Sequence, residues 1–170
     1  AVKPVQPADA EIELARIYDV RDQALPPFTD LDIAAAASFG DKVQLLAHEW
    51  DGAAPVAPGD QGELKIYLRS QATMDVDYNI LVRLIGADGK EIWREEGWPW
   101  GAPTTQWPVG EVRPDGHEVK IPSDAAPGVY KLVASLYDPS TLENLPVLSI
   151  HDGSLIDANV RDLEVLRIGA

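Results

Sequence analysis

The sequence predicts an all-β fold, an antiparallel β-sandwich of seven or eight strands preceded by an N-terminal extension. Short runs of alternating apolar and polar residues recur between turn signals from Phe39 onward, as expected for strands with one buried face. A second observation is the corner Pro127-Gly128, which is followed by Tyr130 at the start of a late strand. Such a tyrosine is typical of the tyrosine corner in immunoglobulin-like and fibronectin type III-like sandwiches. We therefore expect a sandwich of that class.

Residues 1–38 differ from the rest of the chain and are predicted to form an extended linker with one peripheral strand. The first seven residues are rich in proline, and residues 11–18 alternate polar with apolar side chains. Pro26-Pro27 then interrupts any ladder, because proline supplies no backbone N–H group. Residues 39–170 remain as the sandwich domain, which is long enough for one self-supporting core.

The first half of this domain contains four predicted strands. They cover residues 43–50, 63–71, 78–84 and 91–96. The second of them alternates most cleanly, with Leu64, Ile66 and Leu68 on one face. Asp88-Gly89 predicts a tight hairpin turn, so the third and fourth strands should pair with each other.

The second half contains four more predicted strands. They cover residues 117–121, 130–136, 145–150 and 162–168. In the second of these, Tyr130, Leu132, Ala134 and Leu136 form the inward face, and the last two strands are expected to close the second sheet. Residues 97–116 read as a single long irregular connection, and long loops are often functional.

Charge and composition exclude several classes of function. The chain has 28 acidic and 14 basic residues, a formal net charge of -14, which disfavours binding to nucleic acid or to an anionic membrane surface. The absence of cysteine removes disulfides, thiol nucleophiles and cysteine-based zinc sites. No apolar run is long enough to insert into a bilayer, and the chain begins at Ala1 without an initiator methionine. We expect an extracytoplasmic location, secreted or membrane-anchored at the cell surface.

A set of short motifs carries a family resemblance over about residues 39–168. The motifs are Phe39-Gly40-Asp41, Leu45-Leu46, Pro58-Gly59-Asp60, Pro103-Thr104, Trp107, Gly110-Glu111-Val112, Asp115, Pro122, Pro127-Gly128, Tyr130, Leu132, Leu136-Tyr137-Asp138-Pro139 and Leu145-Pro146. Together they resemble the extracytoplasmic β-sandwich region that lies C-terminal to the membrane part of some bacterial protein-mannosyltransferase-like glycosyltransferases, and of related surface proteins. The resemblance implies a non-catalytic accessory module with a parent membrane protein upstream. His48 stands where that family tends to have an aromatic residue.

The candidate ligand-binding residues are Trp98 and Trp100, which lie in the long connection. Sugar rings stack their C–H faces on exposed aromatic side chains, so clustered loop tryptophans are typical of carbohydrate-binding modules. Pro99 between the two forces an extended backbone, so only one of them can easily face inward. Trp93 and Trp107 are expected to cover the core instead.

The sequence contains no catalytic, metal or cofactor motif that stands out. Asp75-Val76-Asp77 matches the Asp-x-Asp motif of glycosyltransferases, but it precedes a strand and reads as turn residues. The three histidines lack partners at metal-ligand spacing, and no serine lies in a nucleophile elbow. We therefore predict no enzyme, no metal site and no cofactor.

The expected function is that of a non-enzymatic extracytoplasmic binding or accessory module of a cell-surface protein or membrane glycosyltransferase. Its partner would be a protein or a glycan at the cell surface. One alternative is a carbohydrate-binding module that uses the loop tryptophans. Another is a structural subunit of a surface assembly that docks through its N-terminal segment, in the way that added strands do elsewhere.

Overall fold

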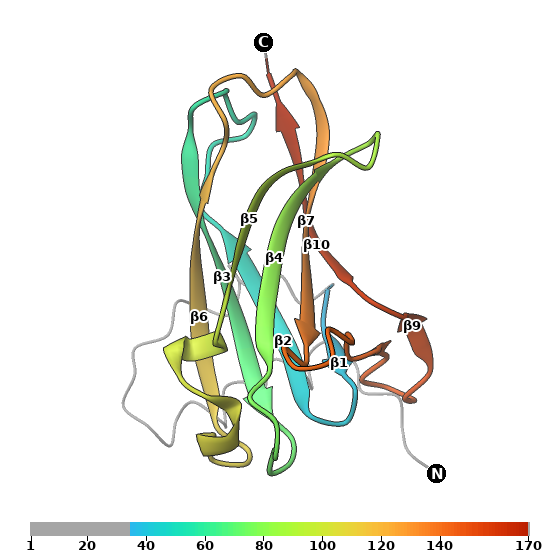
Figure 1. The fold of residues 1–170 in the computed structure, drawn as a ribbon. Helices are drawn as coiled ribbons and strands as arrows, with labels where there is room; N and C mark the ends of the chain where they lie inside the picture. Colours follow the sequence, from blue (N-terminus) through green and yellow to red (C-terminus); the bar gives the residue numbers. More distant parts are fainter. Residues whose placement is uncertain (1–34, 170) are drawn as a thin grey trace.

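The computed structural model describes residues 35–169, which form two antiparallel β-sheets packed face to face (Figure 1). The sheet orders are β6-β3-β2-β1-β8-β9 and β10-β7-β4-β5. The long strands are β2 (Val43–Trp50), β3 (Gln61–Ser70), β4 (Asn79–Gly86), β5 (Glu91–Gly97), β6 (Val112–Lys120), β7 (Gly128–Tyr137) and β10 (Arg161–Ile168). The short strands are β1 (Ala37–Phe39), β8 (Val147–Leu148) and β9 (Leu155–Asp157). The predicted all-β sandwich is confirmed, and the long strands of the described part correspond to the seven or eight expected.

Strands form where the alternation in the sequence is cleanest. Leu64, Ile66 and Leu68 of β3 are fully buried on one face, as their spacing predicts. β4 and β5 pair antiparallel, and the predicted turn joins them. Gly89 has a φ of 80° in this turn, a conformation that favours glycine, and the Lys90 amide donates to the Asp88 side chain at 3.0 Å.

Three sequence expectations need correction. β1 begins at Ala37, inside the predicted extension. Within residues 145–150 only Val147–Leu148 forms a strand, and it pairs with β1 in the six-stranded sheet, so of the last two predicted strands only β10 closes the second sheet. β6 begins at Val112 within the stretch predicted to be irregular, because Pro114 obscures the alternation yet is tolerated on an edge strand. The peripheral strand predicted over residues 11–18 lies outside the described residues.

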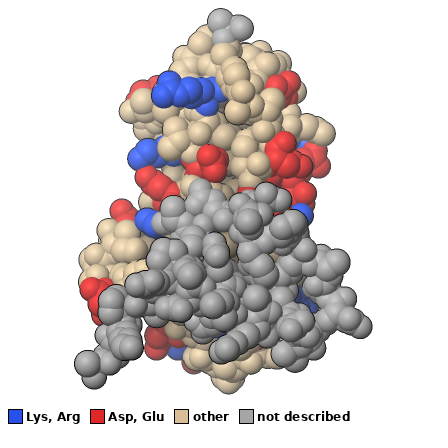
Figure 2. Space-filling view, turned by 180° about the vertical axis from the view of Figure 1, so that it is seen from behind, with Lys and Arg blue, Asp and Glu red and all other residues tan. Residues whose placement is uncertain are grey.

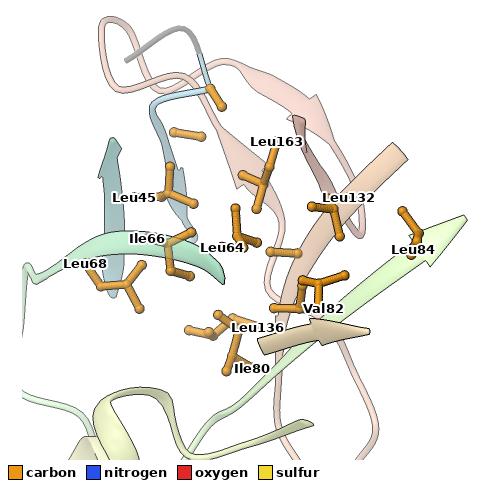
Figure 3. Packing of buried hydrophobic residues seen from close by; sticks show 14 of the residues in the cluster. Leu45, Leu64, Ile66, Leu68, Ile80, Val82, Leu84, Leu132, Leu136 and Leu163 are labelled. Atoms are coloured by element: carbon orange, nitrogen blue, oxygen red, sulfur yellow. The ribbon is translucent and has the colours of Figure 1, made fainter. Parts of the chain in front are cut away.

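Apolar side chains from both sheets fill the space between the layers (Figure 3). Leu45, Leu64 and Ile66 come from the six-stranded sheet and face Leu132 and Leu136 of β7. Burying each such side chain contributes about 1.5–3 kcal/mol relative to leaving it in water. Because the core occupies the interlayer space, a ligand or partner has to be met by loops, sheet edges and outer faces.

The tyrosine corner predicted from the sequence is present. Tyr130 is 8% exposed, and its hydroxyl donates to the carbonyl of Ala126 at 2.9 Å. Leu132, Ala134 and Leu136 follow it on the inner face of β7, and all three are fully buried. This bond ties the chain entering β7 to the strand itself, which fixes the corner between β6 and β7.

The outer surface mixes charges of both signs. Figure 2 shows Asp and Glu side chains interspersed with Lys and Arg on the part of the back face that grey residues leave visible. Residues 35–169 contain no helix that is long and apolar enough to cross a membrane.

Candidate functional site

The candidate site is the connection between β5 and β6, residues 98–111, which we call the tryptophan loop. It contains two single-turn 3-10 helices, Pro99–Gly101 and Thr104–Gln106. Trp98 has the extended backbone that a following proline imposes, with φ -70° and ψ 126°. The chain then reverses at Trp100, whose φ of 62° is unusual for a residue other than glycine.

Trp100 is held in this conformation by packing and hydrogen bonds. Its ring stacks on Trp107, with centroids 3.5 Å apart and planes 11° apart, and the guanidinium carbon of Arg113 lies over the Trp100 ring at 5.1 Å from its centre. The Trp100 indole also donates to the carbonyl of Arg113 at 3.1 Å. A left-handed backbone costs about 1–2 kcal/mol, and these contacts offset that cost.

The structure separates the two candidate ligand-binding residues. Trp98 is 51% exposed, whereas Trp100 is half-buried and has protein neighbours over its ring. Trp107 is buried beneath Trp100, and its indole donates to the carbonyl of Ala102 at 3.2 Å. Trp93 packs against the core from β5. Trp98 therefore presents the available aromatic surface, while Trp100 and Trp107 support the loop that carries it.

A buried polar group fixes the tryptophan loop from below. Asp115 of β6 accepts the backbone N–H of Trp100 on Oδ1 at 3.0 Å, and its Oδ2 lies 2.9 Å from Nε2 of His117. Nδ1 of His117 lies 3.4 Å from a carboxylate oxygen of Glu95 on β5. Strand register places His117 opposite Leu64 and Glu95 opposite Val82, so both side chains lie on inner faces and the ion pair joins the two layers.

Burial and neighbouring carboxylates act on His117 in opposite directions. Burial of the imidazole is the largest influence and lowers its pKa, but the hydrogen bond and charge of Asp115, together with Glu95, outweigh it. The net effect is a raised pKa. Because His117 is only 5% exposed and both ring nitrogens face carboxylates, we interpret the three residues as an anchor for the loop.

A second anchor joins the loop to the segment before β4. The hydroxyl of Thr104, which is fully buried, donates to the carbonyl of Val76 at 2.7 Å and accepts the amide of Tyr78 at 3.0 Å. The Thr105 amide donates to Asp77 at 3.0 Å. The Asp75-Val76-Asp77 motif thus contributes a loop contact through Asp77. Residues 35–169 hold no group of three or more His, Asp or Glu side chains arranged for a metal ion.

The first anchor, formed by Asp115, His117 and Glu95, was not predicted from the sequence, although the sequence contains one signal for it. Asp115 and His117 are two residues apart on a strand whose next alternate residue, Val119, is buried. Polar residues at inward-facing strand positions need partners when they are buried, so their spacing alone marks a buried polar contact. The identity of the partners, Glu95 and the Trp100 amide, depends on how β5 approaches β6.

Comparison with known proteins yields structural similarities only. No protein-family model matches the chain, and no curated protein matches it. The solved C-terminal domain of Wzt is similar in fold, with a TM-score of 0.52, 12% identity, and coverage of 77% of this chain and 75% of that one. A CARDB domain of the PF1109 protein from Pyrococcus furiosus has a TM-score of 0.41 at 13% identity, covering 75% of this chain and 94% of that one.

A beta-glucuronidase 2 variant from Bacteroides uniformis has a TM-score of 0.44 at 11% identity, over 64% of this chain and 12% of that one. At these identities the similarity concerns the fold. The chain is therefore an all-β domain whose architecture resembles that of the Wzt C-terminal domain.

Proposed function

We propose that this protein is a non-enzymatic extracytoplasmic binding or accessory module of a cell-surface protein or a membrane glycosyltransferase. Support for the context comes from the motifs that resemble the sandwich region of mannosyltransferase-like glycosyltransferases, Pro127-Gly128 and Tyr130 among them. Support for a binding role comes from the tryptophan loop. The ring of Trp98 is exposed on a loop that is held in place by stacked aromatic side chains and buried hydrogen bonds. A binding surface needs such preorganisation.

One observation carries the proposal: Trp98 is half-exposed on a loop whose other tryptophans are packed. An indole that is exposed beside two packed ones offers a flat aromatic surface on a loop whose conformation is already fixed. A flat, rigid apolar ring suits the C–H face of a sugar. We propose a cell-surface glycan as the ligand of this loop, with Trp98 as the stacking residue and Trp100 as its support.

A glycan array probed with the full chain tests this ligand. Trp98→Ala should weaken binding about tenfold or more to every glycan that the wild-type chain retains, equivalent to about 1.4 kcal/mol. Val109→Ala is the matched control, because Val109 is 57% exposed in the same loop. The Val109 variant should bind as the wild-type chain does. Absence of binding to any glycan, or equal loss in both variants, would refute the sugar ligand.

The accessory role has its own test in the coding sequence upstream of Ala1. Membrane-spanning helices encoded directly upstream in the same reading frame would support a module of a membrane glycosyltransferase or surface protein. An upstream cytoplasmic catalytic domain in that frame would contradict the proposed location.

A further inference from the structure

Within residues 35–169 the sandwich has four sheet edges, and three of them carry side chains or irregularities that oppose pairing with another strand, whereas the fourth, β9, is limited only by its length of three residues. β6 contains Pro114 and directs Asp115 and His117 inward. β5 carries a charged side chain at four of its seven positions. β10 has a register irregularity between Asp162 and Glu164, and Val56 bridges to its end at Ile168. Charge, proline, inward-pointing ionic groups and irregular register are the devices that keep an edge strand from pairing.

β9 is the fourth edge, and two of its three residues are exposed apolar residues. Its sequence is Leu-Ile-Asp, without proline, lysine or arginine, and all three residues are exposed. Leu155 is 63% exposed and Ile156 43%. β9 pairs with β8 on one side, and the sheet order ends there. Its shortness limits the backbone ladder that it can offer, so side chains have to supply part of any binding.

Two neighbouring turns add apolar side chains to this end of the sheet. Ile150 lies in the turn between β8 and β9 and is 36% exposed. Leu142 lies in the turn between β7 and β8 and is 75% exposed. A hydrogen bond of 3.2 Å between the side chains of Asn144 and Asn159 ties that turn to the chain leaving β9. We call Leu142, Ile150, Leu155 and Ile156 the β9 surface, a name that covers both sides of this edge, because Leu155 and Ile156 are consecutive strand residues and point to opposite faces.

Leu142 is both strained and exposed, which folding does not account for. Its φ is 63°, a left-handed conformation that costs a leucine about 1–2 kcal/mol and that glycine or asparagine adopts more easily. Trp100 is the other non-glycine residue with positive φ among residues 35–169, and stacking and hydrogen bonds offset the cost of its conformation. Leu142 has 75% of its surface in water instead. A strained residue that contributes little to the core points to a role in recognition.

The charges in the segment that carries the β9 surface favour one kind of partner, and the next residue, Arg161, is directed to the carbonyl of Ala35. Residues 138–160 contain four carboxylates, Asp138, Glu143, Asp152 and Asp157, and no lysine or arginine. Hydrogen bonds from their own turns lower the pKa of Asp138, Asp152 and Asp157, so these three stay ionised in mildly acidic solution. An apolar patch within acidic groups suits a strand whose apolar residues alternate with basic ones.

We propose that the β9 surface binds an extended segment of a partner protein in which apolar and basic residues alternate. The segment adds to the edge of β9 that has no partner among residues 35–169, its apolar side chains contact Leu155 and Leu142, and its basic side chains face the four carboxylates. This partner gives the proposed accessory module a protein to which it attaches, so the inference rests on that function. The -14 charge of the chain disfavours a second copy as the occupant.

Fluorescence anisotropy with the full chain tests the proposal. The probe is a labelled ten-residue peptide in which lysine and leucine alternate, and the control peptide has glutamate in place of lysine. Leu155→Ser should weaken binding of the lysine peptide about tenfold or more. Val165→Ser is the matched control, because Val165 is a similarly exposed apolar residue on the edge strand β10, at 55%. That variant should bind as the wild-type chain does, and the glutamate peptide should not bind.

Leu142→Asn separates recognition from folding. Asparagine tolerates the left-handed conformation, so the midpoint of thermal unfolding should stay equal or rise while the peptide binds more weakly. Failure of the lysine peptide to bind, or equal loss in the Val165 variant, would overturn the proposal. So would a dimer of the unliganded chain in sedimentation that Leu155→Ser dissociates, since it would identify the occupant as a second copy. Trp98→Ala should leave peptide binding unchanged, which keeps this result independent of the glycan test.

Discussion

At the scale of single residues, Trp50 depends on two glycines. It is the last residue of β2 and packs against the core, while Gly52 and Gly62 lie against its ring. A Cβ atom at Gly62 would approach the ring to 2.5 Å and the Cα atom of Gly52 to 2.8 Å. Both values are too short for carbon atoms in contact. Glycine at these positions is therefore required by close packing rather than by backbone conformation.

We predict that Gly62→Ala destabilises the protein by about 1–3 kcal/mol, because the ring or a strand has to move. Gly97→Ala is the matched control, since Gly97 also lies in a strand but has open space where its Cβ atom would be. That substitution should change stability little or raise it slightly. Urea denaturation followed by tryptophan fluorescence measures both free energies of unfolding. Equal losses in the two variants would show that strand glycine as such, and not contact with Trp50, determines the effect.

Tyr130 provides a second prediction at this scale. Removing its hydroxyl in Tyr130→Phe leaves the carbonyl of Ala126 without its donor, and should cost about 1 kcal/mol. Tyr137→Phe is the control, because the Tyr137 hydroxyl donates to the exposed Glu96 side chain at 2.9 Å and accepts a long hydrogen bond from the Asn79 side chain at 3.3 Å, and water can replace its contact with Glu96. A smaller loss is therefore expected there. Chemical denaturation of both variants decides whether the corner contributes more than a surface hydrogen bond.

At the scale of strands, two histidine–glutamate pairs join the layers on opposite sides of the core. His117 of β6 faces Glu95 of β5 at 3.4 Å. On the other side, His48 of β2 is fully buried and lies 3.0 Å from Glu164 of β10. In each pair the histidine comes from the six-stranded sheet and the glutamate from an edge strand of the other sheet. The pairs hold the layers together where the sandwich is open to water.

The raised pKa of His117 makes its contribution depend on pH. In the folded state the ring keeps its proton to higher pH than an unfolded histidine, whose pKa is about 6.5. Its stabilising effect is therefore fully present below about pH 6.5 and is lost as the pH rises through the folded-state pKa. An NMR titration of the His117 ring protons should give a midpoint above the unfolded value.

Asp115→Asn tests the cause of that shift. Because it removes the main attractive charge and leaves the ring buried, the titration midpoint of His117 should fall. Glu118→Gln is the control, since Glu118 is exposed on the same strand and does not contact the ring. A midpoint that moves equally in both variants would indicate a general charge effect, and the local contact with Asp115 would then be rejected.

Strands with long alternation could be predicted from the sequence, and short or interrupted ones could not. Leu64, Ile66 and Leu68 identify β3 because three in-facing residues define a period. β9 has three exposed residues and no period, and β1 begins inside the segment that the sequence predicts to be a linker. The candidate site depends on contacts that a sequence pattern does not show: Trp100 packs on Trp107 of the same loop, and its backbone N–H donates to Asp115 of β6. Pro99 between the two tryptophans indicated only that one of them at most would face inward, and it did not indicate which one.

At the scale of the whole molecule, the excess of carboxylates opposes folding while it keeps the chain soluble. The formal charge of -14 comes from 28 acidic and 14 basic residues, and repulsion among the excess carboxylates destabilises the compact state. Several of these pairs are solvent-exposed, such as Lys131 with Asp162 at 2.7 Å, and pairs of this kind contribute little.

We therefore predict that salt stabilises this protein. Raising the NaCl concentration from about 10 mM to about 200 mM shortens the screening length from about 30 Å to below 10 Å, which weakens repulsion across the domain more than it weakens contacting pairs. If the relieved repulsion amounts to about 1 kcal/mol, the midpoint of thermal unfolding should rise by about 2–4 °C. Differential scanning calorimetry at constant pH measures the shift. A midpoint that falls with salt would mean that the close ion pairs and the two interlayer histidine–glutamate contacts contribute more to stability than the net charge removes.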